Sequence, residues 1–221
     1  MNQRGVALIA GLALLAALSL LALVATSGMI LQRHMAANYH ENKLALENSA
    51  IASSFAVAWL YSRANHEREE ACIADCSLPV AIHNVDAIPA QAEYQDLGWW
   101  QSNGIEVGIN PESGESMGGN PGSGANPPLW ILQELHFEVA ENAGDGNPFE
   151  GVGYYRILSR GTGTQAGKIA VTESIVARPW GGDYRLDVFP PAPEVSKFCL
   201  QFAATAEQDH DCGRLAWRQR R

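Results

Sequence analysis

The residues of this chain best suited to covalent chemistry are four cysteines, Cys72, Cys76, Cys199 and Cys212. An even number suits disulfides formed in an oxidising compartment, and four cysteines allow three different pairings. Because short loops close most easily, we expect the pairs Cys72–Cys76 and Cys199–Cys212. The alternative is a zinc site, although the second pair is widely spaced and lacks the turn typical of zinc ligands.

The rest of the sequence lacks the motifs of common catalytic and cofactor sites. It contains no GxSxG, HExxH or P-loop motif and no CxxC redox pair. The histidines show no ligand spacing; they are His34, His40, His66, His83, His136 and His210. Residues 142–147 hint at a calcium loop but lack alternating acidic ligands, so a hairpin turn is favoured. We therefore expect a non-enzymatic protein without a metal or cofactor.

The net charge of -9 disfavours a nucleic-acid partner, because binding phosphates requires clustered Lys and Arg. The basic residues cluster only at the C-terminus, at Arg214, Arg218, Arg220 and Arg221. We interpret this stretch as a frayed, solvated tail, and a binding patch is the alternative.

The N-terminal region contains an uncharged, Leu- and Ala-rich run over residues 6–32. As a helix this run would be about 40 Å long, and the hydrocarbon core of a bilayer is about 30 Å thick. The run therefore predicts a transmembrane helix over 6–32. A cleaved secretory signal with a small-residue site near Ala25 is the alternative, although the apolar core of such a signal is usually only about 7–15 residues long. The flanking charges do not decide the orientation.

The apolar run follows directly on a short polar leader, residues 1–5, which contains Arg4 and ends in Gly5. This layout is typical of the type III signal that prepilin peptidase reads. It predicts cleavage between Gly5 and Val6 and methylation of the new Val6 amine, with the apolar segment kept in the mature protein.

A helical pattern continues beyond the apolar run, with no Gly or Pro between residues 29 and 78. Apolar residues recur there at helical spacings; they are Met35, Tyr39, Leu46, Ile51, Phe55 and Trp59. We predict one helix from about residue 6 to 65, bent near Gly28. Its membrane-spanning first half is followed by a soluble half over 33–65, which is buried on several sides over 50–61.

The remaining chain divides into a connection over 66–128 and a region of strands over 129–221. The connection is rich in Gly and Pro over 104–128, with room for a short strand at 105–109. After residue 129 the sequence alternates, with Leu135, Phe137 and Val139 predicted to face the core and Glu134, His136 and Glu138 to face solvent.

Further strands are predicted at 153–159 and 168–177, joined by a turn at 161–167, and at 184–189. Phe198 and Leu200 beside Cys199 are expected to dock on the core. The predicted fold is α+β: a long N-terminal helix packed on an antiparallel sheet, with a C-terminal region tied by a disulfide.

Two stretches carry a resemblance to a known family. The first is Arg33-His34-Met35-Ala36-Ala37-Asn38 followed by residues 42–46, and the second is residues 155–163 followed by 171–174 and Arg178-Pro179. In their order and spacing they resemble the PilX family of type IV pilus minor pilins, in which paired strands flank an Arg-Gly-x-Gly turn. The matches cover the N-terminal third of the chain and about thirty further residues.

The resemblance implies a pilin-like fold and a part in type IV pilus assembly, in a tip or priming complex. It implies other minor and major pilins as partners, prepilin peptidase as processing enzyme, and a single-pass location in the bacterial inner membrane. The C-terminal domain would be periplasmic, and extracellular once the pilus is assembled.

The sequence departs from the family at two points. The family continues Ala-Ala-Glu where this chain has Ser49-Ala50 after Asn48, so no role of that Glu is transferred. Major pilins carry Glu at the fifth mature position, which is Ala10 here. Two alternatives stay open: a membrane-anchored periplasmic binding or adhesion module, and a type II secretion pseudopilin of the K kind.

Overall fold

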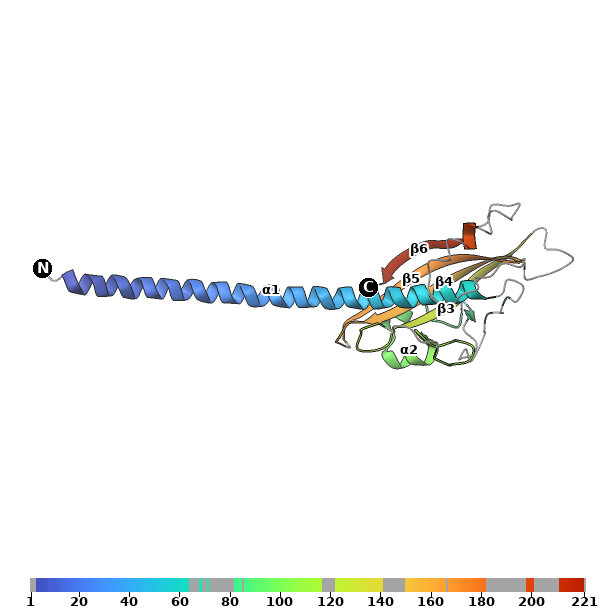
Figure 1. The fold of residues 1–221 in the computed structure, drawn as a ribbon, viewed down its shortest axis with the longest axis horizontal. Coiled ribbons are helices and arrows are strands. Elements are labelled where there is room, and N and C mark those ends of the chain that lie inside the picture. Colours follow the sequence, from blue (N-terminus) through green and yellow to red (C-terminus); the bar gives the residue numbers. More distant parts are fainter. Residues whose placement is uncertain are drawn as a thin grey trace. The chain divides into compact units, whose positions relative to one another are not determined.

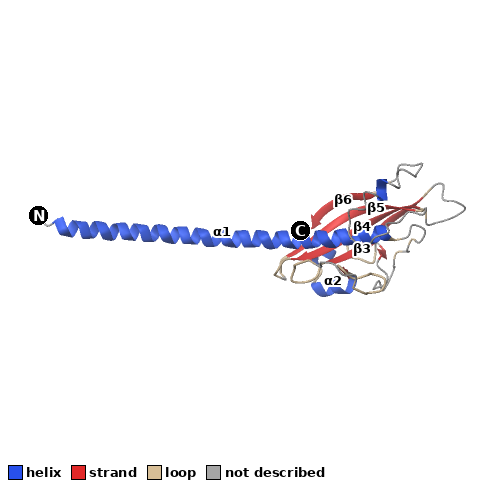
Figure 2. Ribbon diagram, in the orientation of Figure 1, coloured by secondary structure: helices blue, strands red, loops and turns tan. Residues whose placement is uncertain are grey.

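The computed structural model describes residues 3–63, 68, 71, 82–84, 86–116, 122–140, 150–165, 167–181, 198–200 and 211–220. The helices are α1 (Gln3–Ser62), the 3-10 segment η1 (Ala92–Tyr94) and α2 (Leu97–Asn103). The strands are β1 (Ile82–Asn84), β2 (Ile105–Glu106), β3 (Leu129–Val139), β4 (Gly151–Thr162), β5 (Ile169–Trp180) and β6 (Gly213–Arg220). The predicted α+β class is confirmed (Figures 1 and 2).

The chain divides into two compact units, Met1–Glu41 and Asn42–Arg221. The first is the N-terminal part of α1. The second contains the last turns of α1 and the sheet. Helical hydrogen bonding continues through Gly28, where we expected a bend.

The strands form one sheet in the order β1-β3-β4-β5-β6, and β2 also pairs with β3. β3, β4 and β5 pair antiparallel, as predicted. β6, which was not predicted as a strand, pairs antiparallel with β5. β1, however, pairs with β3 in parallel, so the sheet is mixed and the expectation of a purely antiparallel sheet is wrong. A parallel pair needs a long crossover instead of a hairpin, and the long connection before β3 provides one.

Both faces of the sheet are covered near the start of β3, because neighbouring side chains of a strand point to opposite faces. Trp130 and Leu132 pack with α1 on one face, where the ring centroids of Trp59 and Trp130 are 5.7 Å apart. Leu129 and Ile131 pack on the other face, in a cluster with Ile88, Ala92 and Trp100 of the segment that contains η1 and α2.

This two-sided cover corrects the predicted alternation of β3. Residues 129–133 are all buried, and the register shifts at a bulge between Glu134 and His136. Leu135 and Val139, predicted to face the core, are 36% and 51% exposed. The predicted alternation assumes that one face of the strand contacts solvent, whereas neither face does so in the first half of β3.

α1 packs on the sheet through small residues. Ala45, Ser49 and Ala52 are buried, whereas Met35, Tyr39 and Ile51 of the predicted apolar face are exposed. The Oγ of Ser49 donates a hydrogen bond of 2.8 Å to the carbonyl of Ser159 in β4. The expectation of burial on several sides holds from Phe55 to Tyr61, where every residue is buried, and fails at Ala50 and Ile51.

Gly161 explains why small residues line this face of α1. A Cβ at Gly161 would lie 2.3 Å from the Ala45 carbonyl and from the Ser49 amide nitrogen. We predicted that Gly161 begins a turn, but it lies inside β4, where it permits close approach of the helix backbone. The hairpin loop that follows is closed by a 2.8 Å bond from Gly163 N–H to the Lys168 carbonyl.

Several expectations lie outside the described residues. These are the Cys72–Cys76 pair, the turn at 142–147 and the strand at 184–189. The short strand expected at 105–109 is present as β2, which ends at Glu106.

Candidate functional site

The N-terminal part of α1 is apolar over a length sufficient to cross a membrane. Its large apolar side chains are each 53–71% exposed, and they include Ile9, Leu12, Leu14, Leu15, Leu18, Leu20, Leu21, Leu23, Val24, Met29, Ile30 and Leu31. A continuous apolar surface of this extent indicates contact with lipid or with other helices.

The hydroxyl groups within this segment are bonded inside the helix. Ser19 Oγ donates to the Leu15 carbonyl at 2.8 Å, and Thr26 Oγ1 donates to the Ala22 carbonyl at 2.9 Å. Such bonds satisfy hydroxyl groups where no water is present, as in a bilayer. The predicted processing residues Gly5 and Val6 lie in the first turns of the same helix.

The second candidate region is β6, which corrects our interpretation of the C-terminus. The predicted frayed tail is instead an ordered strand that pairs with β5 from Gly213 to Arg220 (Figure 1). Residues 214–219 are nonetheless all exposed, and Leu215 and Trp217 are 47% and 48% exposed.

Arginines of β6 bind a buried carboxylate of β5. Glu173, whose side chain is 8% exposed, accepts hydrogen bonds of 3.0–3.1 Å from Arg218 Nε and Nη2. The Nε atoms of Arg220 and Arg156 lie 3.0 and 3.3 Å from Glu173 oxygens without hydrogen-bond alignment, so these contacts are ion pairs. Arg220 also donates to the Ala90 carbonyl at 3.0 Å. Glu173 thus holds β6 to the sheet.

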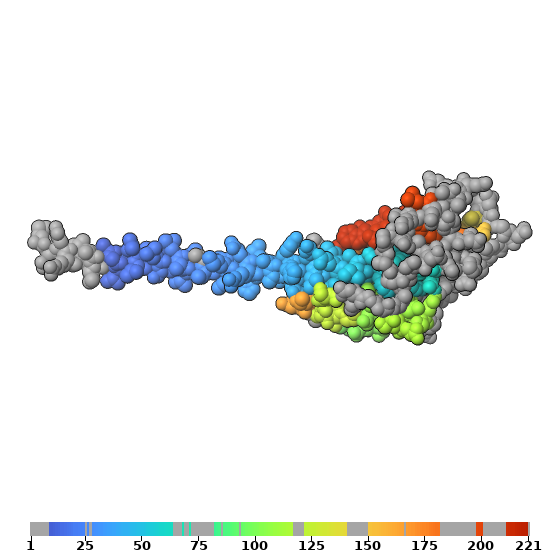
Figure 3. All heavy atoms as spheres, viewed as in Figure 1, coloured from blue at the N-terminus to red at the C-terminus, as the bar shows by residue number. Residues whose placement is uncertain are grey.

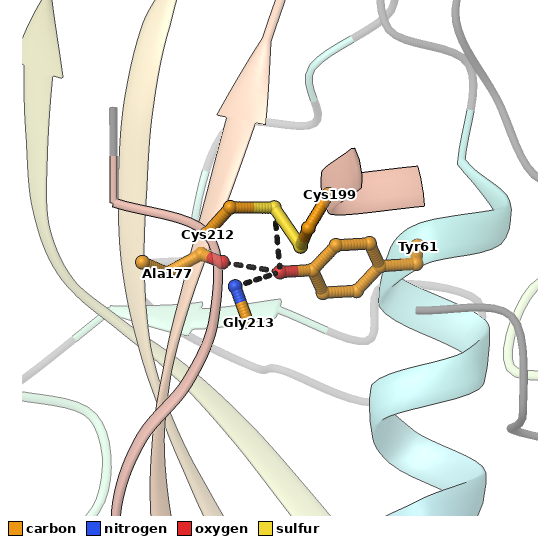
Figure 4. The surroundings of a disulfide bond; sticks show 5 residues. All are labelled: Tyr61, Ala177, Cys199, Cys212 and Gly213. Atoms are coloured by element: carbon orange, nitrogen blue, oxygen red, sulfur yellow. Dashed lines mark hydrogen bonds between the residues drawn. A yellow bond between two sulfur atoms is a disulfide. The ribbon is translucent and has the colours of Figure 1, made fainter. Parts of the chain in front are cut away.

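A disulfide fixes the other end of β6. Cys199 and Cys212 are bonded, which confirms that predicted pair (Figure 4). Phe198 beside it is fully buried and packs edge-on against the Tyr61 ring at 5.1 Å, as expected for docking on the core. Leu200 is 73% exposed, so its predicted docking is wrong. Residues 198–200 are helical, and positions two apart on a helix point to different sides.

Tyr61, at the end of α1, links the helix to this junction. Its hydroxyl donates to the Ala177 carbonyl of β5 and accepts a 2.9 Å bond from the Gly213 N–H. The hydroxyl also lies 3.8 Å from Cys212 Sγ (Figure 4). Burial raises the pKa of Tyr61 to about 12, against smaller opposing effects of the Gly213 bond and the Arg178 charge.

Arg178 lies beside Tyr61 and is fully buried. Its Cζ is 3.5 Å from the centroid of the Trp180 ring, and Nη2 donates to the Arg63 carbonyl at 2.5 Å. Burial lowers the pKa of Arg178 to about 9, because desolvation disfavours the charged form. This guanidinium joins the end of α1 to β5.

Sequence reasoning missed Tyr61, Glu173 and Arg178. Glu173 has a sequence signal, because a charged residue inside a predicted strand requires a partner if the strand is buried. Arg178 lies one position beyond the strand predicted at 168–177 and has no such signal. Tyr61 has none, because its partners are distant in sequence. The histidines carry no ligand cluster: in the parts of the chain described, no three His, Cys, Asp or Glu side chains gather as metal ligands. His136 is exposed, as predicted, and stacks on Tyr154.

Fold and surfaces together define an α+β protein with an exposed apolar N-terminal helix and a C-terminal strand fixed by a disulfide. The chain matches no protein-family model, no curated protein and no solved structure.

Proposed function

We propose that this protein is a non-enzymatic minor pilin, held in the bacterial inner membrane by α1 and incorporated into a type IV pilus. The observation that carries the proposal is that one uninterrupted helix combines an exposed apolar segment with a buried half. Residues such as Leu12 and Leu21 are over 60% exposed, whereas Ala52 and Leu60 are fully buried. A helix used in this way serves as membrane anchor and as core of the folded domain.

The packing of the second half of α1 supports this proposal. Ser49 Oγ lies 2.7 Å from Thr172 Oγ1 of β5, and Asn48 Nδ2 donates to the Thr162 carbonyl at 2.7 Å. These buried polar contacts, together with Gly161, fix the distance between the helix and the sheet and the position of the helix along the strands. The domain therefore depends on the helix that anchors it.

The N-terminus of the mature protein tests the proposal. We expect mass spectrometry of the chain, isolated from bacterial membranes with prepilin peptidase present, to find a methylated Val6 at the N-terminus. Gly5→Leu should block cleavage, whereas Gly11→Leu, inside the apolar run, should not. A mature protein that begins near Thr26 would contradict the proposal and indicate a secretory signal.

Ala10 supports a position at the pilus tip. In a filament core an acidic residue at this place neutralises the N-terminal amine of a neighbour, and an unpaired buried charge costs several kcal/mol. A subunit with Ala10 has no such carboxylate. We expect gold label on the folded domain to gather at pilus ends, and Ala10→Glu to increase incorporation along the shaft. Even labelling of unmodified pili would refute the tip position.

The same residue favours one alternative function, a membrane-anchored periplasmic binding module that never enters a filament. The absence of the protein from sheared pili, despite a processed Val6 terminus, would support this alternative.

A further inference from the structure

β6 has a sheet neighbour on one side only among the described strands. It pairs with β5, and β5 pairs with β4, so β6 is the last strand in the order. Every second backbone N–H and C=O group of an edge strand points away from its sheet. Residues 214–219 are all exposed, so this edge is accessible along most of the strand (Figure 3).

The side chains of β6 differ between its two faces. Arg218 and Arg220 contact Glu173, on the face opposite α1. Trp217 is paired with Ser174, whose hydroxyl lies 3.3 Å from Ser53 of α1, so Trp217 is on the α1 face. Arg214, beyond the bulge, is also on the α1 face, where its Nη2 donates to Ser53 Oγ at 3.5 Å. The face opposite α1 therefore carries two arginines, and the α1 face carries Arg214 and a half-exposed tryptophan.

Both ends of β6 are fixed in place. At its start, Gly213 N–H is bonded to Tyr61 and the adjacent Cys212 is held in the disulfide. Near its end, Arg218 is bonded to the buried Glu173. A strand already held in extended form loses little conformational entropy when another strand pairs with it.

We propose that β6 is a docking edge that adds a strand from another protein, an extended segment in which acidic and apolar residues alternate. Main-chain hydrogen bonds would supply the pairing, as in other cases of strand addition. Carboxylates would lie beside Arg218 and Arg220, and apolar side chains would lie beside Trp217. The inference does not depend on the proposed function.

Charge argues against a second copy of this chain as the occupant. β6 contains three arginines and no acidic residue, whereas the whole chain has a net charge of -9. A two-fold β6–β6 pair would bring two copies of this arginine-rich strand side by side, and like charges on neighbouring strands are destabilising. An acidic strand is free of the charge penalty.

Peptide binding to the full chain in detergent micelles tests the proposal. The probe is an eight-residue peptide that alternates valine and glutamate. We expect it to bind, and we expect no binding of a valine–lysine peptide or of the valine–glutamate peptide N-methylated along one edge. Binding of the N-methylated peptide would overturn the proposal, because main-chain pairing would then not be involved.

A variant and its matched control locate the binding. Trp217→Thr should weaken binding of the valine–glutamate peptide about tenfold or more, as is typical when an aromatic contact is lost from an interface. Ile169→Thr, at the equally exposed start of β5, should leave binding unchanged. Equal effects of both variants would overturn the proposal. So would dimers of the chain that Trp217→Thr disrupts, since the occupant would then be a second copy.

Discussion

Tyr61→Phe is the sharpest test of how the C-terminal strand is held to the helix. The change removes one hydroxyl and leaves the ring in place, so it creates almost no cavity. It leaves the Gly213 N–H and the Ala177 carbonyl without this partner. An unsatisfied buried group costs about 1–3 kcal/mol. Because the carbonyl retains a second lone pair, we expect the free energy of unfolding to fall by about 2 kcal/mol.

The effect of pH adds a second signature. Burial raises the pKa of Tyr61 from 10.0 to about 12. The part of the folding free energy that depends on a neutral Tyr61 hydroxyl is therefore fully present below pH 10. It is lost as pH rises through 12, because the unfolded chain releases this proton first. Two pKa units correspond to about 3 kcal/mol. The advantage of the native protein over Tyr61→Phe should therefore disappear by pH 12.

The assay is urea unfolding of both proteins in detergent micelles, followed by circular dichroism at pH 8, 10 and 11.5. The pKa of Tyr155 is also raised by burial, but its titration is common to both proteins and cancels in the comparison. Tyr154→Phe is the control, because the Tyr154 hydroxyl bonds Asp211 at an exposed position. Equal unfolding free energies of the native protein and Tyr61→Phe at pH 8 would refute the reasoning, as would a difference that does not change with pH.

Three further changes test the packing, and urea unfolding measures each one. Gly161→Ala should destabilise the fold by about 3 kcal/mol by forcing α1 off the sheet, whereas Gly167→Ala, in open space, should be nearly neutral; equal effects would show that α1 does not approach β4 closely. Glu173→Gln should cost about 2–3 kcal/mol, because partly buried arginines lose their counter-ion; an unchanged stability would mean that these ion pairs contribute nothing. Replacing Cys199 and Cys212 with serine should cost about 3 kcal/mol in the chain-entropy model, and a neutral result would show that β6 is held without the disulfide.

Local patterns in the sequence predicted the main elements. The charge-free run over 6–32 predicted an apolar helix, because a long apolar stretch allows few other structures. Alternation and turn residues located β3, β4 and β5 to within three residues at each end. The short spacing of Cys199 and Cys212 predicted their pairing, because a short loop closes at little entropic cost.

Tertiary structure decided what depends on distant partners. The sequence predicts a solvated tail for the arginines of β6, because it does not show that Glu173 lies on the neighbouring strand. The sequence predicts that Gly161 begins a turn, since a turn and a close helix contact both favour glycine. The same limit applies to Tyr61, whose hydroxyl joins α1, β5 and β6. Composition and periodicity report on neighbours along the chain, whereas these residues are fixed by neighbours more than a hundred positions away or on another strand.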